Sequence, residues 1–245
     1  MKPVGHVSEL WRYPVVGLQG ESLQKVKIIG SGIWGDRAYQ LRDRGGKILG
    51  PVPQSTSPTE RSILGLGASI DETTGGGVLN VAFHDQLASA DRPDFARMLD
   101  RAVGVPVLLE ESTVPATRVK RGRAIHLISN TSIRGLKKSY PAGDFDIRRF
   151  RPNLVLDLGQ GAKDFAEEAW VGRSLRVGDA ALRVEKPNER CVVTTLPQGN
   201  LPADTRILET IVEANGRNLG MMCSVERGGL VALGDSVFLD GNRQT

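Results

Sequence analysis

The chain has 245 residues, of which 40% are apolar and 24% charged, and these proportions exclude a collagen-like or largely disordered protein. The formal net charge of +4 favours anionic partners without identifying one. No apolar stretch approaches the roughly 18 residues of a membrane-spanning helix, and the N-terminal residues lack the apolar core of a signal peptide. We therefore expect no membrane association and a cytoplasmic location.

Most of the chain is predicted to form short strands bounded by Gly, Pro, Asn or Asp. In chain order we expect strands at 26–29 and 78–83, a helix from Asp91 to Gly104, a strand at 105–109, a short helix at 132–138, strands at 154–157, 182–186 and 191–196, a helix from Asp204 to Gly216, and a strand at 236–239. Because few helices connect the strands, the pattern favours antiparallel sheets or closed barrels. The predicted fold class is mainly β with a few α-helices (α+β).

A polar stretch at residues 110–123 contains Pro115 and separates two strand-rich halves, each with one clear helix. We place a domain boundary within it and expect one domain at residues 1–112 and a second at 113–245. The glycine run at residues 75–77 is expected to form a hairpin tip rather than a linker.

The GSGIWG segment at residues 30–35 matches the GxGxxG pattern of dinucleotide-binding proteins. Such a site needs a helix that opens at the last glycine, but Gly45 and Gly46 follow too soon for one. We therefore predict a hairpin at this position. Asp36 and Arg37 come directly after the glycine turn, where a local ion pair is the simpler explanation for them.

Several enzyme classes are disfavoured, because the sequence contains no GxSxG, P-loop or HExxH motif. These classes are the serine hydrolases, P-loop NTPases and zinc proteases. The three histidines, His6, His84 and His126, are scattered, and the sequence gives structural and functional roles equal weight for each.

The two cysteines, Cys191 and Cys223, provide no disulfide framework and no cysteine-rich zinc site. Cys191 follows a charged segment at residues 186–190, and Arg190 beside it would favour the thiolate, which is the nucleophilic and metal-binding form. The alternative is that Cys191 is a small buried apolar residue, as most free cysteines are. We assign that alternative to Cys223.

Basic residues gather in the middle third of the chain and predict a positive surface or pocket; they are Arg118, Lys120, Arg121, Arg123, Lys137, Lys138, Arg148, Arg149 and Arg151. With 5% aromatic residues and no nucleic-acid-binding motif, we expect no nucleic-acid partner and favour a small phosphate-bearing ligand. Because Pro152 disfavours helix at the preceding residue, Arg151 and Asn153 are candidates for a rigid anion clamp. An ordinary loop-to-strand junction is the alternative.

The order of these motifs resembles the MOSC-domain family, named after the C-terminal domain of molybdenum-cofactor sulfurase, and within it the amidoxime-reducing-component branch. The resemblance covers nearly the whole chain; it rests on VSELWRYPVVGLQGE at 7–21, SGIWGDRAY at 31–39, FRPN at 150–153, VGDA at 177–180, RCVVTT at 190–195 and LGDSV at 233–237. It implies a smaller β-rich, barrel-like N-terminal domain at 1–112 and a β-barrel MOSC domain at 113–245.

The resemblance also implies a molybdenum cofactor, in which molybdopterin holds the metal and Cys191 is the single protein ligand and catalytic residue. Arg37, Arg151 and Asn153 match cofactor-binding positions, as do Arg190 and Thr194 within the cysteine motif. A soft thiolate suits molybdenum, and guanidinium groups suit a phosphate. The branch often has Lys-Ser where this chain has Val16-Gly17, and Lys25 or Lys27 are candidates to replace that pair.

The implied function is an oxidoreductase that reduces small N-hydroxylated substrates, such as hydroxylamines and amidoximes. Electrons would come from a separate ferredoxin, flavodoxin or cytochrome-type protein, and no pyridoxal phosphate is expected. A different class remains open at this point: a carrier that uses Cys191 to hold the cofactor or a persulfide sulfur for delivery to another protein.

Overall fold

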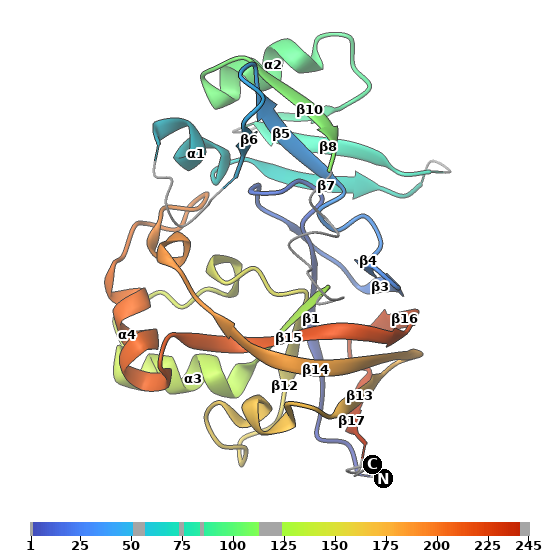
Figure 1. Cartoon of the computed structure of the whole chain (residues 1–245), viewed down its shortest axis with the longest axis vertical. Helices are drawn as coiled ribbons and strands as arrows, with labels where there is room; N and C mark the ends of the chain where they lie inside the picture. Colours follow the sequence, from blue (N-terminus) through green and yellow to red (C-terminus); the bar gives the residue numbers. More distant parts are fainter. Residues whose placement is uncertain (1, 51–56, 74–75, 84–85, 113–123, 241–245) are drawn as a thin grey trace.

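The computed structural model describes residues 2–50, 57–73, 76–83, 86–112 and 124–240. The described residues form two parts along the long axis of the molecule, with the N-terminal sheets at one end and a barrel at the other (Figure 1). Within these ranges, no helix combines the length and apolar character needed to cross a bilayer.

The barrel is a closed ring of seven strands among the described residues. In spatial order they are β12 (Leu154–Asp157), β11 (Ile125–Ser129), β15 (Asn218–Arg227), β14 (Ala180–Glu189), β13 (Ser174–Val177), β17 (Ser236–Leu239) and β1 (Gly5–Arg12). The ring closes because β1 pairs with both β17 and β12. Neighbours are antiparallel except β11 and β12, which are parallel. The expectation of a mainly β fold with a closed barrel is confirmed.

The core of the barrel follows from the two-residue period of its strands. In β14, Ala180, Leu182 and Val184 are buried while the alternate side chains are more exposed. On one side, α3 (Asn130–Ser139) and α4 (Arg206–Asn215) pack together over a second apolar cluster that includes Leu136 and Ile207 (Figure 1). These helices occur where apolar residues recur at helical spacing.

The N-terminal part contains two three-stranded sheets. One is formed by β10 (Val107–Glu111), β5 (Tyr39–Asp43) and β6 (Ile48–Leu49), and the other by β7 (Gly67–Asp71), β8 (Val78–Phe83) and β9 (Gln86–Ser89). Two helices, α1 (Pro58–Ile63) and α2 (Phe95–Val103), lie at this end of the molecule (Figure 1). The sheets and α2 share one apolar cluster, so this part has a core of its own.

Strands from the N-terminal segment also join the C-terminal half. β1 is a barrel strand, and β2 (Glu21–Ser22) pairs with its end. A third small sheet combines β3 (Lys25–Ile29) and β4 (Gly32–Ile33) with β16 (Gly229–Ala232). The predicted domain boundary at residues 112 and 113 stays a prediction, whereas the observed pairing puts β1 and β3 with C-terminal strands.

Most of the predicted elements are present in the structure. The helices ending at Gly104 and Gly216 are observed as α2 and α4, and both glycines are left-handed, with φ of 85° and 57°. The GSGIWG segment is a hairpin between β3 and β4, as predicted, and no helix follows it. The predicted glycine tip between β7 and β8 falls partly outside the described residues, because Gly75 is not among them.

The predicted strand at 191–196 is wrong. Residues Val192–Thr195 form a short 3-10 helix, η3. The Thr194 hydroxyl donates to the Cys191 carbonyl at 3.0 Å, and the Thr195 hydroxyl donates to the Val192 carbonyl at 2.7 Å. These local side-chain bonds to the backbone favour a tight turn over the extended conformation that β-branched residues otherwise prefer.

Candidate functional site

The site is built around Tyr13, which directly follows β1 and is almost completely buried. Its backbone N–H donates to Oδ1 of Asp36 at 2.8 Å, and its carbonyl accepts from the backbone N–H of Arg37 at 2.7 Å. The carboxylate of Asp36 also pairs with the guanidinium of Arg37. The local ion pair predicted for these two residues is therefore present, and it fixes Arg37 beside Tyr13.

Arginine side chains from three separate segments meet near this ring. The guanidinium carbon of Arg151 lies 4.4 Å from the Tyr13 ring centroid, and that of Arg37 lies 5.5 Å from it. Arg190 is close enough to Cys191, Tyr13 and Arg151 for their charges to alter its pKa. Burial lowers the pKa of Arg151 and of Arg190 to about 10, so both remain cationic at neutral pH.

The backbone is strained at these positions. Arg37 and Arg151 have φ of 53° and 54°, and Arg217, whose carbonyl accepts from the N–H of Arg190, has φ of 76°. The described residues contain one other non-glycine with positive φ, Phe165. Left-handed backbone at non-glycine residues is costly and tends to be retained at binding and catalytic sites. Here it holds Arg37 and Arg151 against Tyr13.

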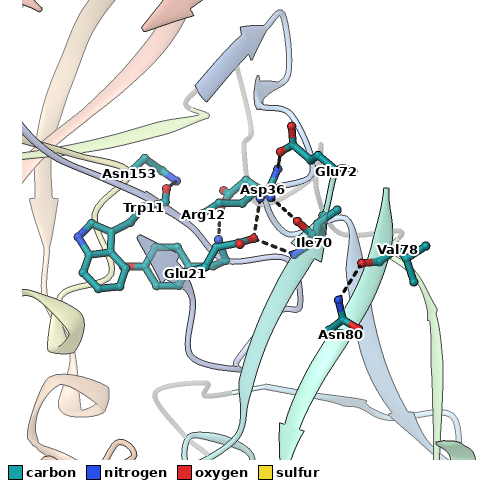
Figure 2. Close-up of polar contacts among 10 residues, drawn as sticks. Trp11, Arg12, Glu21, Asp36, Ile70, Glu72, Val78, Asn80 and Asn153 are labelled. Atoms are coloured by element: carbon teal, nitrogen blue, oxygen red, sulfur yellow. Dashed lines mark hydrogen bonds and ion pairs between the residues drawn. The ribbon is translucent and has the colours of Figure 1, made fainter. Parts of the chain in front are cut away.

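Asn153 is fully buried and joins three strands. Its Oδ1 accepts from the N–H of His126 at 3.1 Å, and its Nδ2 donates to the carbonyl of Trp11 at 3.3 Å (Figure 2). Its own N–H donates to the His126 carbonyl at 2.7 Å. The observed contacts make Asn153 a clamp between β1, β11 and β12, next to Arg151. Its predicted contact with a cofactor stays a prediction.

His126, in β11, is buried next to the backbone of Arg151. Its Nδ1 is 3.3 Å from the carbonyl of Arg151, and its Nε2 is 3.4 Å from the carbonyl of Leu219. Burial, and then the charge of Arg190, lower the pKa of His126 to about 3. The ring is therefore neutral at neutral pH, and its single N–H can serve only one of the two carbonyls. This points to a positioning role rather than proton transfer.

Cys191 lies at the end of β14, just before η3, and is partly exposed. Its carbonyl accepts from both the N–H and the hydroxyl of Thr194, at 3.1 and 3.0 Å. Thr194 is buried and thus holds the backbone at the thiol. Arg190 turns inward, where its Nη2 donates to the carbonyl of Phe150 at 2.8 Å. Cys223 is fully buried in the barrel core, as predicted.

The charges and unpaired polar atoms of this group fit an anionic ligand. Within the described ranges, neither Arg151 nor Arg190 forms an ion pair with a carboxylate. The hydroxyl of Tyr13 and Nε of Arg190 are buried without a hydrogen-bond partner. Buried polar groups normally have partners, so these donors indicate a ligand with acceptor atoms.

A metal at this site would need ligands beyond those that the described residues supply. Among the described residues, no group of three or more His, Cys, Asp or Glu side chains could hold a metal ion. Cys191 offers one thiolate beside guanidinium groups. This donor set suits a metal that arrives in an anionic cofactor and takes one protein ligand.

The structure brings together Cys191 and four predicted positions, Arg37, Arg151, Arg190 and Thr194, with Asn153 adjacent. The turn with Val16 and Gly17 is contacted by Arg151, whose Nη2 donates to the carbonyl of Leu18 at 2.5 Å. The two lysines proposed as replacements line a separate cavity, described below.

Of the middle-third basic residues, Arg149 does not contribute to a positive surface. Arg149 is fully buried and donates to the carbonyls of Asp144 and Pro202 at 2.8 Å each. Arg118, Lys120, Arg121 and Arg123 lie outside the described residues, as does His84.

Tyr13 is the residue that sequence reasoning did not select, since it appeared only within the segment at 7–21. The sequence left the role of His126 open, and the apolar strand around it gave no sign of the two carbonyls that face its ring.

The fold and site define a β-barrel protein with an anion-accepting group of arginines beside one thiol. The family model described as the MOSC domain matches residues 111–238, more than half of the chain. The chain therefore belongs to the MOSC-domain family, and MOSC domains are associated with binding of the molybdenum cofactor.

The chain is also similar to solved structures. The YUAD protein from Bacillus subtilis is 14% identical, with a TM-score of 0.54 over 98% of this chain and 97% of that one, which shows a shared fold. YiiM from Geobacillus stearothermophilus is 20% identical over 48% of this chain and 54% of its own, with a TM-score of 0.35. YiiM from Escherichia coli is 19% identical over 50% and 57%, with a TM-score of 0.38. No curated protein sequence matches the chain.

Proposed function

We propose that this protein binds the molybdenum cofactor with Cys191 as the protein ligand of the metal and uses it to reduce small N-hydroxylated substrates. One observation carries the proposal. Arg190 is buried and Arg151 is partly buried, and neither has a carboxylate partner among the described residues. Both lie with the unpaired Tyr13 hydroxyl near a partly exposed thiol.

The residues present fit this cofactor by their chemistry. Arg37 and Arg151 would hold its phosphate, since guanidinium groups bind phosphate oxygens through paired N–H donors. Cys191 would bind the metal through its sulfur, which suits a soft metal. Thr194 keeps Cys191 at the end of β14 through two bonds to its carbonyl.

When bound, the metal centre would supply the two-electron chemistry at the N–O bond. The net reaction consumes two electrons and two protons and releases the reduced nitrogen compound and water. Burial raises the pKa of Tyr13, so its phenol stays protonated and acts as a hydrogen-bond donor. His126 is neutral, with its pKa lowered to about 3, and therefore positions the Arg151 segment without supplying a proton.

The electrons are proposed to come from a separate ferredoxin, flavodoxin or cytochrome-type protein. Within the described part of the chain, no cluster of cysteine, histidine or carboxylate side chains could hold a second metal centre. A two-electron reduction therefore needs a partner that reaches the exposed side of the site.

Activity with benzamidoxime tests the proposed reaction. The wild type and Cys191→Ser would be purified from a host that makes the cofactor and assayed for benzamidine with chemically reduced methyl viologen as electron source. We expect turnover in the wild type and at least about a hundredfold loss in Cys191→Ser. Bound cofactor that passes to an acceptor protein without any turnover would instead support a carrier of the cofactor or of a persulfide sulfur.

A further inference from the structure

A pocket lies apart from the site at Cys191, where the β16–β3–β4 sheet faces the hairpin of β7 and β8. Its volume is about 320 Å³, and its lining includes Arg12, Lys25, Lys27, Trp34, Glu72 and Leu230. None of Arg37, Arg151, Arg190 or Cys191 is part of that lining. The volume is at the lower end of small-molecule pockets, which are typically about 300–1,000 Å³.

The positive charge of this pocket comes from β3. Lys25 and Lys27 are exposed, and because side chains alternate along a strand they project from the same face. Among the described residues, the side-chain ammonium group of neither lysine makes a hydrogen bond or ion pair. Two ammonium groups on one wall of a cavity repel each other, so an anion between them is stabilised by both.

Arg12 does not add to this excess, because carboxylates surround it. Its Nε donates to Oε1 of Glu21 at 2.8 Å and its Nη1 donates to Oε1 of Glu72 at 2.5 Å (Figure 2). Its Nη2 donates to the carbonyl of Ile70 at 3.1 Å. The charge of Arg12 balances one of the two carboxylates. The two positive charges of Lys25 and Lys27 then exceed the single negative charge of the other carboxylate.

The pocket also has an apolar side. Leu230 pairs with Lys27 across β16 and β3, and its side chain is 52% exposed. Trp34 is half-buried, with the guanidinium carbon of Arg12 5.5 Å from its ring. A flat apolar ligand in this pocket would cover both Leu230 and the indole.

The wall near Trp34 is preformed by backbone. Gly77 has φ of 76°, and a Cβ at this position would lie 2.9 Å from the Trp34 ring. The β7–β8 connection therefore approaches the indole as closely as only glycine permits. Arg12, which lies over the same indole, is only 2% exposed and is held by three acceptors.

We propose that this pocket binds a small aromatic anion, with its acidic group between Lys25 and Lys27 and its ring against Trp34 and Leu230. The site is independent of the cofactor proposal, because it shares no lining residue with the cluster at Cys191.

The test is isothermal titration calorimetry of the full chain with phenyl phosphate, inorganic phosphate and phenol. We expect saturable binding of phenyl phosphate that is tighter than binding of inorganic phosphate or phenol, because each of these offers half of the recognised chemistry. The variant Lys25→Gln/Lys27→Gln should weaken binding at least about tenfold. The control Lys137→Gln/Lys163→Gln removes the same charge from other exposed lysines and should leave the affinity unchanged.

Two further variants locate the bound ligand. Leu230→Ser replaces an exposed side chain, so the fold should persist, and it should weaken phenyl phosphate more than inorganic phosphate. Arg37→Gln should have no effect. Absence of saturable binding, equal affinity in the Lys25/Lys27 variant, or loss of binding in Arg37→Gln would overturn the proposal, and the last result would assign the anion to the site at Cys191.

Discussion

The guanidinium group of Arg151 lies over the ring of Tyr13, with its central carbon 4.4 Å from the ring centroid. Tyr13 comes from the end of β1, whereas Arg151 precedes β12, and Arg37 approaches the same ring from the N-terminal part. Cation–π attraction offsets only part of the repulsion between two such cations. The arrangement is therefore complete only when both parts of the chain are folded, and a bound anion would stabilise it further.

Removing the Tyr13 hydroxyl distinguishes a role of this group in cofactor binding from a role in folding. Tyr13→Phe keeps the ring beside Arg37 and Arg151 but deletes a buried hydroxyl that has no hydrogen-bond partner among the described residues. We expect the free energy of unfolding without cofactor to stay within about 1 kcal/mol of wild type or to rise, because no intramolecular bond is lost. Retained molybdenum should fall. Urea denaturation and elemental analysis measure the two effects, and a large loss of stability with unchanged metal content would refute this role.

Two neighbouring threonines provide a matched pair. Thr194→Val removes the hydroxyl bond to the Cys191 carbonyl, while Thr195→Val removes the equivalent bond to Val192. Each change should cost about 0.5–1.5 kcal/mol of stability. Only Thr194→Val should lower molybdenum retention, because only Thr194 holds the residue with the thiol. Equal metal loss in both variants would show that the η3 turn acts as a unit.

Buried Arg12 should contribute more to stability than its exposed partner Glu72. Arg12→Met leaves Glu21 without its cation next to the backbone of Ile70, and removing one partner of a buried pair typically costs about 3–5 kcal/mol. Glu72→Gln changes a carboxylate that is 57% exposed and should cost less than about 1 kcal/mol. Urea unfolding of both variants checks this order, and similar losses would contradict it.

Stability should fall as the pH drops below about 6.5, and His126 should contribute to that fall. Its pKa is about 3 in the folded protein against 6.5 for the free side chain, so the unfolded state binds more protons between these values. The free energy of unfolding then rises with pH across this window, with a His126 contribution of at most about 1.4 kcal/mol per pH unit. His126→Gln should flatten the curve between pH 4 and 6. An unchanged slope in His126→Gln over this range would contradict the contribution of His126.

Local patterns in the sequence predicted much of the fold. Alternating apolar residues gave β8, and the glycines at 104 and 216 marked the ends of α2 and α4. The segment that forms β1 was assigned to the N-terminal domain through the resemblance, whereas it is a strand of the barrel, because its pairing with β12 joins residues far apart in the chain. The strand predicted at 191–196 failed because hydroxyl bonds to nearby carbonyls outweigh β propensity.

The candidate site was only partly predictable for the same reason. Arg37, Arg151, Arg190 and Cys191 were selected from motifs, and the structure brings them together. The central position of Tyr13 depends on contacts with two arginines from distant segments, and the neutral state of His126 depends on burial. Neither property is encoded in a short motif.

The molybdenum content of the purified protein tests directly whether Cys191 holds the cofactor. Wild type, Cys191→Ala and Cys223→Ala would be expressed in a host that makes the cofactor and measured by elemental mass spectrometry, with circular dichroism to confirm folding. We expect nearly one molybdenum per chain in wild type and in Cys223→Ala, and little in Cys191→Ala. Negligible molybdenum in all three folded proteins, or equal amounts in all three, would contradict it.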